Sequence, residues 1–189
     1  MGEGELMEVL RSHEIVADRE PTAEEIAVRV LWAYQDAVLI ECAAPAGAAA
    51  AMAHPNPPSG FSTAYVLAGS YRATVGTGGS ASGAAHVETV AAGGFNHDDR
   101  ETWPAGAPVT YEAHAGTRWR CFHQSWLAPS RAVQSVHGAP ATIALPAGGL
   151  LAVIGGETNA ADGTFVLRTD ESATVTLTRG WAWLTAPAA

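Results

Sequence analysis

The densest run of side chains that could do chemistry is His97-Asp98-Asp99-Arg100-Glu101, with one imidazole and three carboxylates in five residues. His97 and Asp99 could bind a metal ion or act as an acid–base pair, since imidazole and carboxylate groups serve both roles. The alternative is an acidic surface turn ahead of Trp103, because charged runs usually face solvent. The residues alone leave both interpretations open.

A second cluster combines arginine with tryptophan: Arg118, Trp119, Arg120 and, a little further on, Trp126. Strand alternation would place Arg118 and Arg120 on one face and Trp119 on the other. Arginine and tryptophan are enriched at the hot spots of protein interfaces, so the cluster is a candidate interface. A half-buried strand with stacked arginines is the alternative.

Trp181 and Trp183 flank Ala182 near the end of the sequence. Alternation along a strand puts both indole rings on the same side. Such a pair could close the end of a barrel or dock on a neighbouring subunit. We therefore add both residues to the candidate interface.

Familiar catalytic motifs are missing from the sequence. It has no GxSxG elbow, no P-loop, no Rossmann glycine pattern and no HExxH. Cys42 and Cys121 are not in a CxxC pair, and two thiols are too few for a zinc site, so we expect buried, hydrophobic cysteines. We predict no catalytic residue.

Composition narrows the class of partner. The 189 residues are 48% hydrophobic and 15% charged, with a formal net charge of −9. A nucleic-acid or anionic-membrane partner would require a basic face, so we expect neither. No apolar run reaches the roughly 18 residues of a membrane span, and the N-terminal stretch lacks a signal-peptide core. We therefore expect a protein of the cytoplasm, or of a virion or other particle assembled there.

Short alternating segments separated by Gly and Pro predict an all-β fold. Near the end of the sequence we expect turns at Gly155-Gly156 and Arg179-Gly180, the second of them between strands over Ala173–Leu177 and Trp181–Leu184. Strand alternation places Ile26, Val28, Val30, Trp32 and Tyr34 on one face and Arg29 on the other. A turn at Gln35-Asp36 then leads to a second strand over Ala37 to Cys42, so we predict a β-hairpin. Thr22 and Glu25 resemble a capping box, which would favour a helix in place of the hairpin, but the alternation favours strands. In the segment before residue 25 we expect an arm with one or two helical turns.

The order of segments from Ala27 to Phe122 resembles the cupin superfamily of small β-barrels. The stretch "GAAAAMAHPNPPSGFSTAYVLAGSYRATV" is similar to the first cupin motif, and "WPAGAPVTYEAHAGTRWRCF" is similar to the second. The resemblance implies a cupin-like β-barrel or jelly roll. It covers about half of the chain.

Metal-binding cupins typically supply two His and a Glu from the first motif and a third His from the second. In this sequence His54 matches the first position, Asn56 the second, and Ser62 lies at or near the Glu position. The last position falls on Val109, which cannot bind a metal ion. One remaining ligand would not hold a metal tightly, so we predict no metal and no cofactor.

A shifted alignment would bring in other imidazoles. His97 or His114 could then join His54 and Asn56 in a pocket inside the barrel. These four residues are the candidate pocket of the alternative interpretation. A stoichiometric metal ion that is lost on His54→Ala substitution would support it.

The segment after the barrel resembles the back half of a cupin barrel, in "LPAGGLLAVIGGE" and "ADGTFVLRTDESATVTLTRGWAWLTA". We therefore expect four parts: an N-terminal arm over 1–24, a cupin-like β-barrel over 25–124, a connection over 125–140, and a second, shorter β unit over 141–189.

Taken together, these features predict a non-catalytic structural or interaction subunit of a larger assembly, whose partners are other copies of itself and other proteins. The "RWRCFHQ" segment resembles small cupin-like proteins of tailed phages, which implies a virion decoration, collar or tail component. The alternatives are a metal-dependent cupin enzyme and a small-ligand or sugar-binding module.

Overall fold

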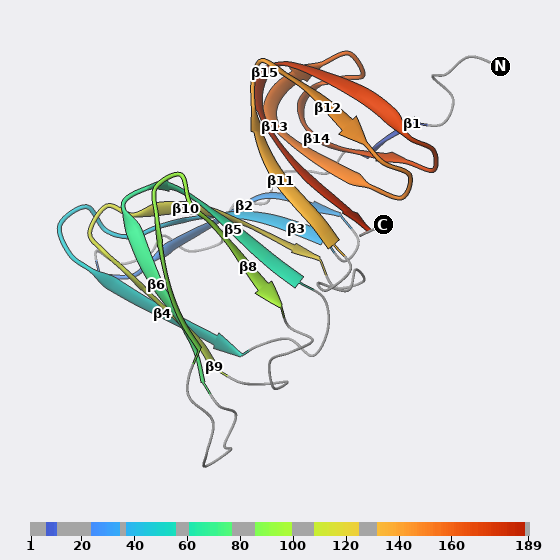
Figure 1. Cartoon of the computed structure of the whole chain (residues 1–189). Helices are drawn as coiled ribbons and strands as arrows, with labels where there is room; N and C mark the ends of the chain where they lie inside the picture. Colours follow the sequence, from blue (N-terminus) through green and yellow to red (C-terminus); the bar gives the residue numbers. More distant parts are fainter. Residues whose placement is uncertain are drawn as a thin grey trace. The chain divides into compact units, whose positions relative to one another are not determined.

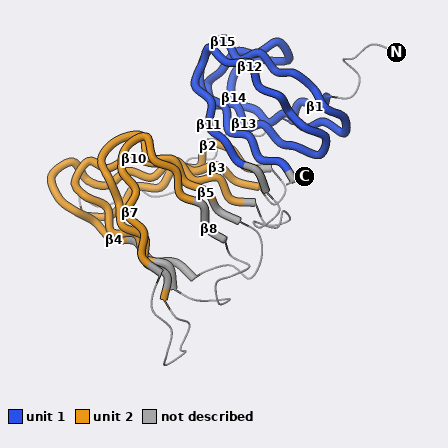
Figure 2. The backbone as a smooth tube through the Cα atoms, in the orientation of Figure 1, with its two compact units in different colours: residues 1–13, 130–189 blue, residues 14–129 orange. Residues whose placement is uncertain are grey.

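The structure, a computed structural model, describes residues 7–10, 24–34, 37–55, 61–76, 86–99, 108–124 and 132–187. All regular elements in these ranges are β-strands (Figure 1). The chain forms two compact units, of residues 1–13 with 130–189 (unit 1) and residues 14–129 (unit 2) (Figure 2). No helix in the described ranges is long and apolar enough to cross a membrane.

The described residues of unit 2 form nine strands in two antiparallel sheets. They are β2 (Ala27–Tyr34), β3 (Ala37–Ala43), β4 (Ala50–Pro55), β5 (Phe61–Ala68), β6 (Ser70–Val75), β7 (His86–Ala91), β8 (Phe95–Asp99), β9 (Pro108–Ala113) and β10 (Arg118–Gln124). The five-stranded sheet has the order β2-β3-β10-β5-β8, and the four-stranded sheet has the order β4-β9-β6-β7. The chain passes repeatedly between the two sheets, and from β3 to β10 this order is that of an eight-stranded jelly roll, with β2 added at one edge. The predicted all-β fold is confirmed.

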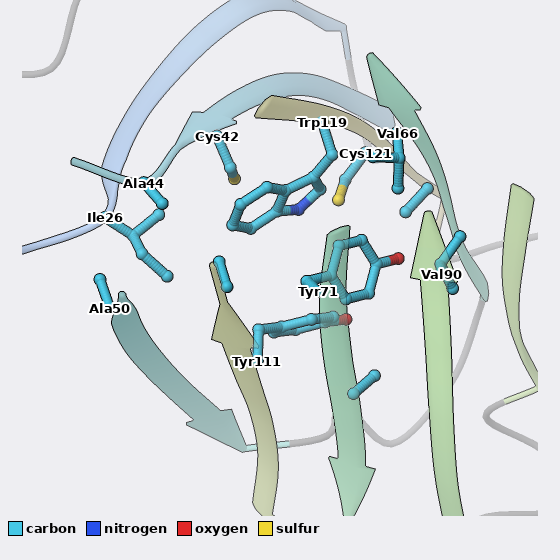
Figure 3. Packing of buried hydrophobic residues seen from close by; sticks show 13 residues of the cluster. Ile26, Cys42, Ala44, Ala50, Val66, Tyr71, Val90, Tyr111, Trp119 and Cys121 are labelled. Atoms are coloured by element: carbon cyan, nitrogen blue, oxygen red, sulfur yellow. The ribbon is translucent and has the colours of Figure 1, made fainter. Parts of the chain in front are cut away.

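The space between the two sheets is filled by a core of apolar and aromatic side chains (Figure 3). Tyr71 and Tyr111 come from the four-stranded sheet and Trp119 from the five-stranded sheet. The ring of Tyr71 lies 5.5 Å from that of Tyr111 and 5.2 Å from that of Trp119, centroid to centroid. Cys42 and Cys121 point into the same space, as buried cysteines that are not in a disulfide. Large aromatic rings in contact stabilise the packing of one sheet on the other.

The predicted hairpin is present as β2 and β3, but its alternation is interrupted. Val30 pairs with Ile40 and Trp32 pairs with Leu39, so Leu31 is an extra residue in β2. Such a bulge exchanges the two faces of a strand beyond it. Trp32 therefore lies on the face opposite Val28, and our expectation that the two share a face was wrong.

In unit 1, the part of the chain that the structure describes forms one six-stranded antiparallel sheet. Its strands are β1 (Met7–Leu10), β11 (Ala132–Gly138), β12 (Ala141–Leu145), β13 (Leu150–Thr158), β14 (Asp162–Thr169) and β15 (Ala173–Pro187). A core of buried aliphatic residues and Phe165 covers one face of the sheet. The first half of β15 pairs with β12 and its second half pairs with β11. One long strand thus holds β11 and β12 in the same sheet.

Gly180 allows β15 to continue where the sequence predicted a turn. Its φ is +82°, and a Cβ at this position would lie 2.6 Å from Cα of Gly156. Only glycine fits such an approach at a positive φ without strain. The two strands expected over Ala173–Leu177 and Trp181–Leu184 are therefore one, and Gly155-Gly156, also expected as a turn, lies inside β13.

The structure divides the chain differently from the four parts expected. In the predicted arm, Met7–Leu10 is a strand that pairs with β14, where helical turns were expected. The predicted connection over 125–140 contains β11. The strands β1 and β11 therefore belong to unit 1, because each is hydrogen-bonded to its sheet.

Candidate functional site

The predicted interior pocket does not form around His114. This residue follows β9 and is exposed to solvent. His54 pairs with Val109 at the other end of β9, about 17 Å away at the usual rise of a strand. His97 lies in the other sheet, in β8, where it pairs with Thr63. The side chains of His54 and His97, and all of Asn56, lie outside what the structure describes.

No group of three or more His, Cys, Asp or Glu side chains gathers within the part of the chain that is described. The interior positions around Trp119 carry the apolar and aromatic residues of Figure 3 instead.

A charged cluster lies on the outer face of the five-stranded sheet. At its centre is Glu41 of β3, whose side chain is only 10% exposed. Oε2 of Glu41 accepts a hydrogen bond from Nε of Arg120 at 3.0 Å, and Oε1 accepts one from Nη2 of Arg118 at 3.0 Å. Nη2 of Arg29 lies 3.7 Å from Oε1. We call these four residues the Glu41 cluster.

The pairing of the strands brings this cluster together. Glu41 is directly opposite Arg29 on β2 and Arg120 on β10. Trp119 and Cys121, the neighbours of Arg120, are buried in the core, so the arginines face outward. The predicted alternation of Arg118 and Arg120 against Trp119 is thus observed.

Sequence reasoning found Arg118 and Arg120 but missed Glu41 and Arg29. With a two-residue turn at 35–36 and regular pairing, Arg29 would face Cys42. The extra residue Leu31 shifts the register by one, and Arg29 faces Glu41 instead. A bulge of this kind leaves no clear signal in the sequence.

Burial by itself raises the pKa of Glu41, but hydrogen bonds and charges from Arg118 and Arg120 outweigh it. The pKa of Glu41 is therefore lowered from its ordinary value of 4.5. The carboxylate stays ionised at neutral pH and holds the guanidinium groups in fixed directions. The side chains of Arg29 and Arg118 are each 53% exposed, which leaves part of each available to another molecule.

Arg29, Glu41 and Arg120 lie opposite one another on three neighbouring strands, and this outward-facing row of side chains continues across the rest of the sheet. Arg120 pairs with Tyr65 of β5, and Tyr65 pairs with Phe95 of β8. Tyr65 is half-buried, and Phe95 is 36% exposed. From Arg29 to Phe95 the row crosses five strands and spans about 19 Å at the usual strand spacing. We call it the cross-sheet row.

The tryptophans of the predicted interface separate into two groups. Trp119 is 0% exposed and Trp183 is 4% exposed, so neither can contribute a large contact surface. Trp181 is 37% exposed, and Trp126 lies outside the described residues. The prediction was wrong for Trp119 and Trp183, because a large apolar side chain on a half-buried strand is more favourably placed in the core.

An open concavity of about 580 Å³ lies on the outer face of the four-stranded sheet. Its polar lining consists of Arg72, Thr89, Glu112 and His114, around a floor of alanines. Arg72 is opposite both Glu112 and Thr89, and its Nη1 lies 3.8 Å from Oε2 of Glu112. His114 was assigned to the interior and lines this outer surface instead.

No protein-family model and no curated protein sequence matches this chain. Solved structures do. HutD from Pseudomonas fluorescens SBW25 matches with a TM-score of 0.60 and 10% identity, over 96% of this chain and 98% of that one. The chain shares the fold of HutD. Because the match spans nearly the whole length of both chains, it includes the strands of both units.

Two further solved structures are similar at lower scores. A cupin 2 conserved barrel domain protein from Leptotrichia buccalis matches with a TM-score of 0.48 and 10% identity, over 88% of this chain and 90% of that one. A mutant of oxalate decarboxylase from Bacillus subtilis matches with a TM-score of 0.42 and 9% identity, over 99% of this chain and 74% of that one. The strand order of unit 2 is that of a jelly roll, an architecture that cupins share with other double-sheet β proteins.

Proposed function

We propose that this protein is a non-catalytic interaction subunit of a larger protein assembly, and that it binds its partner through the cross-sheet row and the Glu41 cluster. The observation that carries the proposal is the arrangement of three arginines around the mostly buried carboxylate of Glu41. The side chains are fixed before binding, so that less conformational entropy is lost when a partner binds.

The charge of this surface indicates the chemistry of the partner. The cluster has three positive charges and one negative charge, on a chain whose formal net charge is −9. Guanidinium groups bind carboxylates in pairs of parallel hydrogen bonds. Phe95 and Tyr65 add an apolar, aromatic contact beside the charges. The expected partner surface is acidic, with an apolar patch next to its carboxylates.

We also propose that the assembly is the virion of a tailed phage, with this chain as a decoration, collar or tail component. This finer assignment is supported by the sequence resemblance of the Arg118–Gln124 segment, which is also the strand that supplies two arginines of the cluster. A further support is the acidic character of the chain, because copies of it offer carboxylates to the basic cluster of a neighbour.

The test is the native mass of the purified full-length protein, measured across a range of concentrations. We expect species larger than the 19.5 kDa chain. The double variant Arg118→Ala/Phe95→Ala should weaken association by roughly tenfold or more, since such residues dominate interface energies. A monomer at all concentrations, with no partner recovered from the assembled particle, would refute the proposal.

Arg72→Ala is the matched control. The side chain of Arg72 is 54% exposed and is ion-paired to Glu112, as the 53%-exposed Arg118 is to Glu41. It lies on the other sheet of unit 2, so its removal should leave association unchanged. Equal weakening by both variants would show that loss of surface charge, and not this surface, controls association.

The concavity on the four-stranded sheet favours a second candidate, a small-ligand-binding module. Arg72 and His114 supply donors, and Glu112 an acceptor, around a floor of alanines. A thermal-shift screen of glycans, short peptides and carboxylic acids tests this candidate. A stabilising ligand should lose its effect in Arg72→Ala but not in Arg118→Ala, and the absence of any shift would count against it.

A further inference from the structure

The N-terminal strand β1 completes a sheet that is otherwise built from the far end of the chain. Met7–Leu10 pairs with Val166–Thr169 of β14, at the edge of the six-stranded sheet. Among the described strands, β14 is the only one with which β1 pairs. The edge of β14 is therefore an acceptor for one short strand that arrives from a distant part of the sequence.

The contacts of β1 define what this edge accepts. Met7 and Val9 pack against the aliphatic core of unit 1, and Leu10 is only 7% exposed. Glu8 lies directly opposite Arg168, whose Nη2 lies 3.7 Å from Oδ1 of Asp170. The pattern of apolar residues sets the register, because a shift by one residue would turn Val9 away from the core.

The connection to the rest of the chain does not restrict β1 to its own subunit. Residues 11–26, 16 in number, link β1 to β2, which belongs to unit 2. An extended segment of this length spans at most roughly 55 Å. A neighbouring copy within that reach could receive the strand with every contact between β1 and β14 unchanged.

We infer that the edge of β14 is a strand-acceptor site for the N-terminal segment of a second copy of this chain, and that two copies exchange β1 reciprocally. The exchanged dimer and the monomer contain the same strand pairing. The equilibrium between them therefore depends on two concentrations: that of the protein, and the effective concentration of β1 near its own β14, which the 11–26 connection sets. The dimer is favoured as the first approaches the second. This inference is independent of the proposed function, because it uses unit 1 and not the cross-sheet row of unit 2.

A disulfide between opposite positions tests the exchange. In the full-length variant Glu8→Cys/Arg168→Cys, oxidation joins β1 to whichever β14 it occupies. The protein is unfolded, refolded at concentrations from about 10 µM to about 1 mM, oxidised, and examined on a non-reducing gel; effective concentrations of short flexible connections lie in the millimolar range. We expect a dimer band whose share rises roughly tenfold over this range.

Glu8→Cys/Asp162→Cys is the control, since Asp162 lies on β14 outside the stretch paired with β1. It should give little cross-linking. Strand exchange would be overturned if Glu8→Cys/Arg168→Cys formed cross-links only within single chains at every concentration. No cross-link of either kind would overturn the acceptor site itself.

Two additions separate this inference from the proposed function and from misfolding. Far-ultraviolet circular dichroism of each cysteine variant must match the wild type under reducing conditions. Adding Arg118→Ala/Phe95→Ala to the cysteine pair should leave the cross-linked dimer unchanged, while it weakens the non-covalent association proposed above. Loss of the cross-linked dimer in this combined variant would mean that the dimer forms through the cross-sheet row, and would overturn strand exchange.

Discussion

Nε of Arg120 donates a hydrogen bond to Oε2 of Glu41 at 3.0 Å, between two residues that are directly opposite each other on neighbouring strands. Arg118 binds the other carboxylate oxygen of Glu41 from two residues earlier on the same strand. One carboxylate thus joins β3 to β10 through side chains, in addition to the backbone ladder. This relationship links the stability of unit 2 to the surface through which we propose that it binds.

Removal of the carboxylate should destabilise the protein. Glu41→Ala leaves Arg120, whose side chain is 20% exposed, without its acceptor. Hydrogen bonds to charged groups contribute about 1.5–3 kcal/mol each, and a buried group left unpaired costs more. We expect a loss of about 2–4 kcal/mol in the free energy of unfolding, measured by urea denaturation. Arg118→Ala, which removes a half-exposed partner, should cost less than about 1 kcal/mol.

Stability should depend on the ionisation of Glu41. Its pKa is lowered in the folded state from the ordinary value of 4.5, so the unfolded state binds a proton more readily. The contribution of the carboxylate is therefore fully present above about pH 4.5 and is lost as the pH falls through the lowered pKa of the folded protein. The difference in stability between wild type and Glu41→Gln should shrink over that range. A difference that stays constant with pH would contradict the lowered pKa.

Protonation of His137 should also change the stability of the protein, at a higher pH than that of Glu41. Burial lowers its pKa from the ordinary value of 6.5, and its Nε2 lies 2.8 Å from Oγ of Ser135. The unfolded state then takes up a proton first as the pH falls, so stability decreases below about pH 6.5 until the folded pKa is passed. In His137→Gln this decrease should be absent. Thermal melts between pH 5 and 8, with NMR titration of the His137 ring, would measure both effects.

Gly180→Ala should destabilise unit 1 more than Gly155→Ala does. Both glycines have a positive φ, +82° and +52°, but only at Gly180 would a Cβ meet backbone atoms, 2.6 Å from Cα of Gly156. Positive φ alone costs an alanine about 1 kcal/mol, and the collision adds to that cost. We expect about 1 kcal/mol for Gly155→Ala and at least about 3 kcal/mol for Gly180→Ala. Equal costs would show that β15 does not pass close to β13 at this point.

The local pattern of residues was sufficient for the class of fold and for most of the strands. Alternation predicted the hairpin of β2 and β3, and Gly and Pro marked most of the turns between later strands. These signals are local, because they depend on which side chains alternate and on which backbone angles a residue permits. They also placed Arg118 and Arg120 on a common outward face.

Long-range strand pairing decided which residues lie opposite one another and which are buried. The bulge at Leu31 brings Arg29 to Glu41, and the edge of β14 receives Met7–Leu10 from the opposite end of the chain. The same long-range packing placed Trp119 in the core and His114 on the surface. Such outcomes depend on the competition of all strands for partners and of all large side chains for buried space. The sequence by itself therefore determined the elements of this protein, and only the tertiary structure decided which residues the elements bring together.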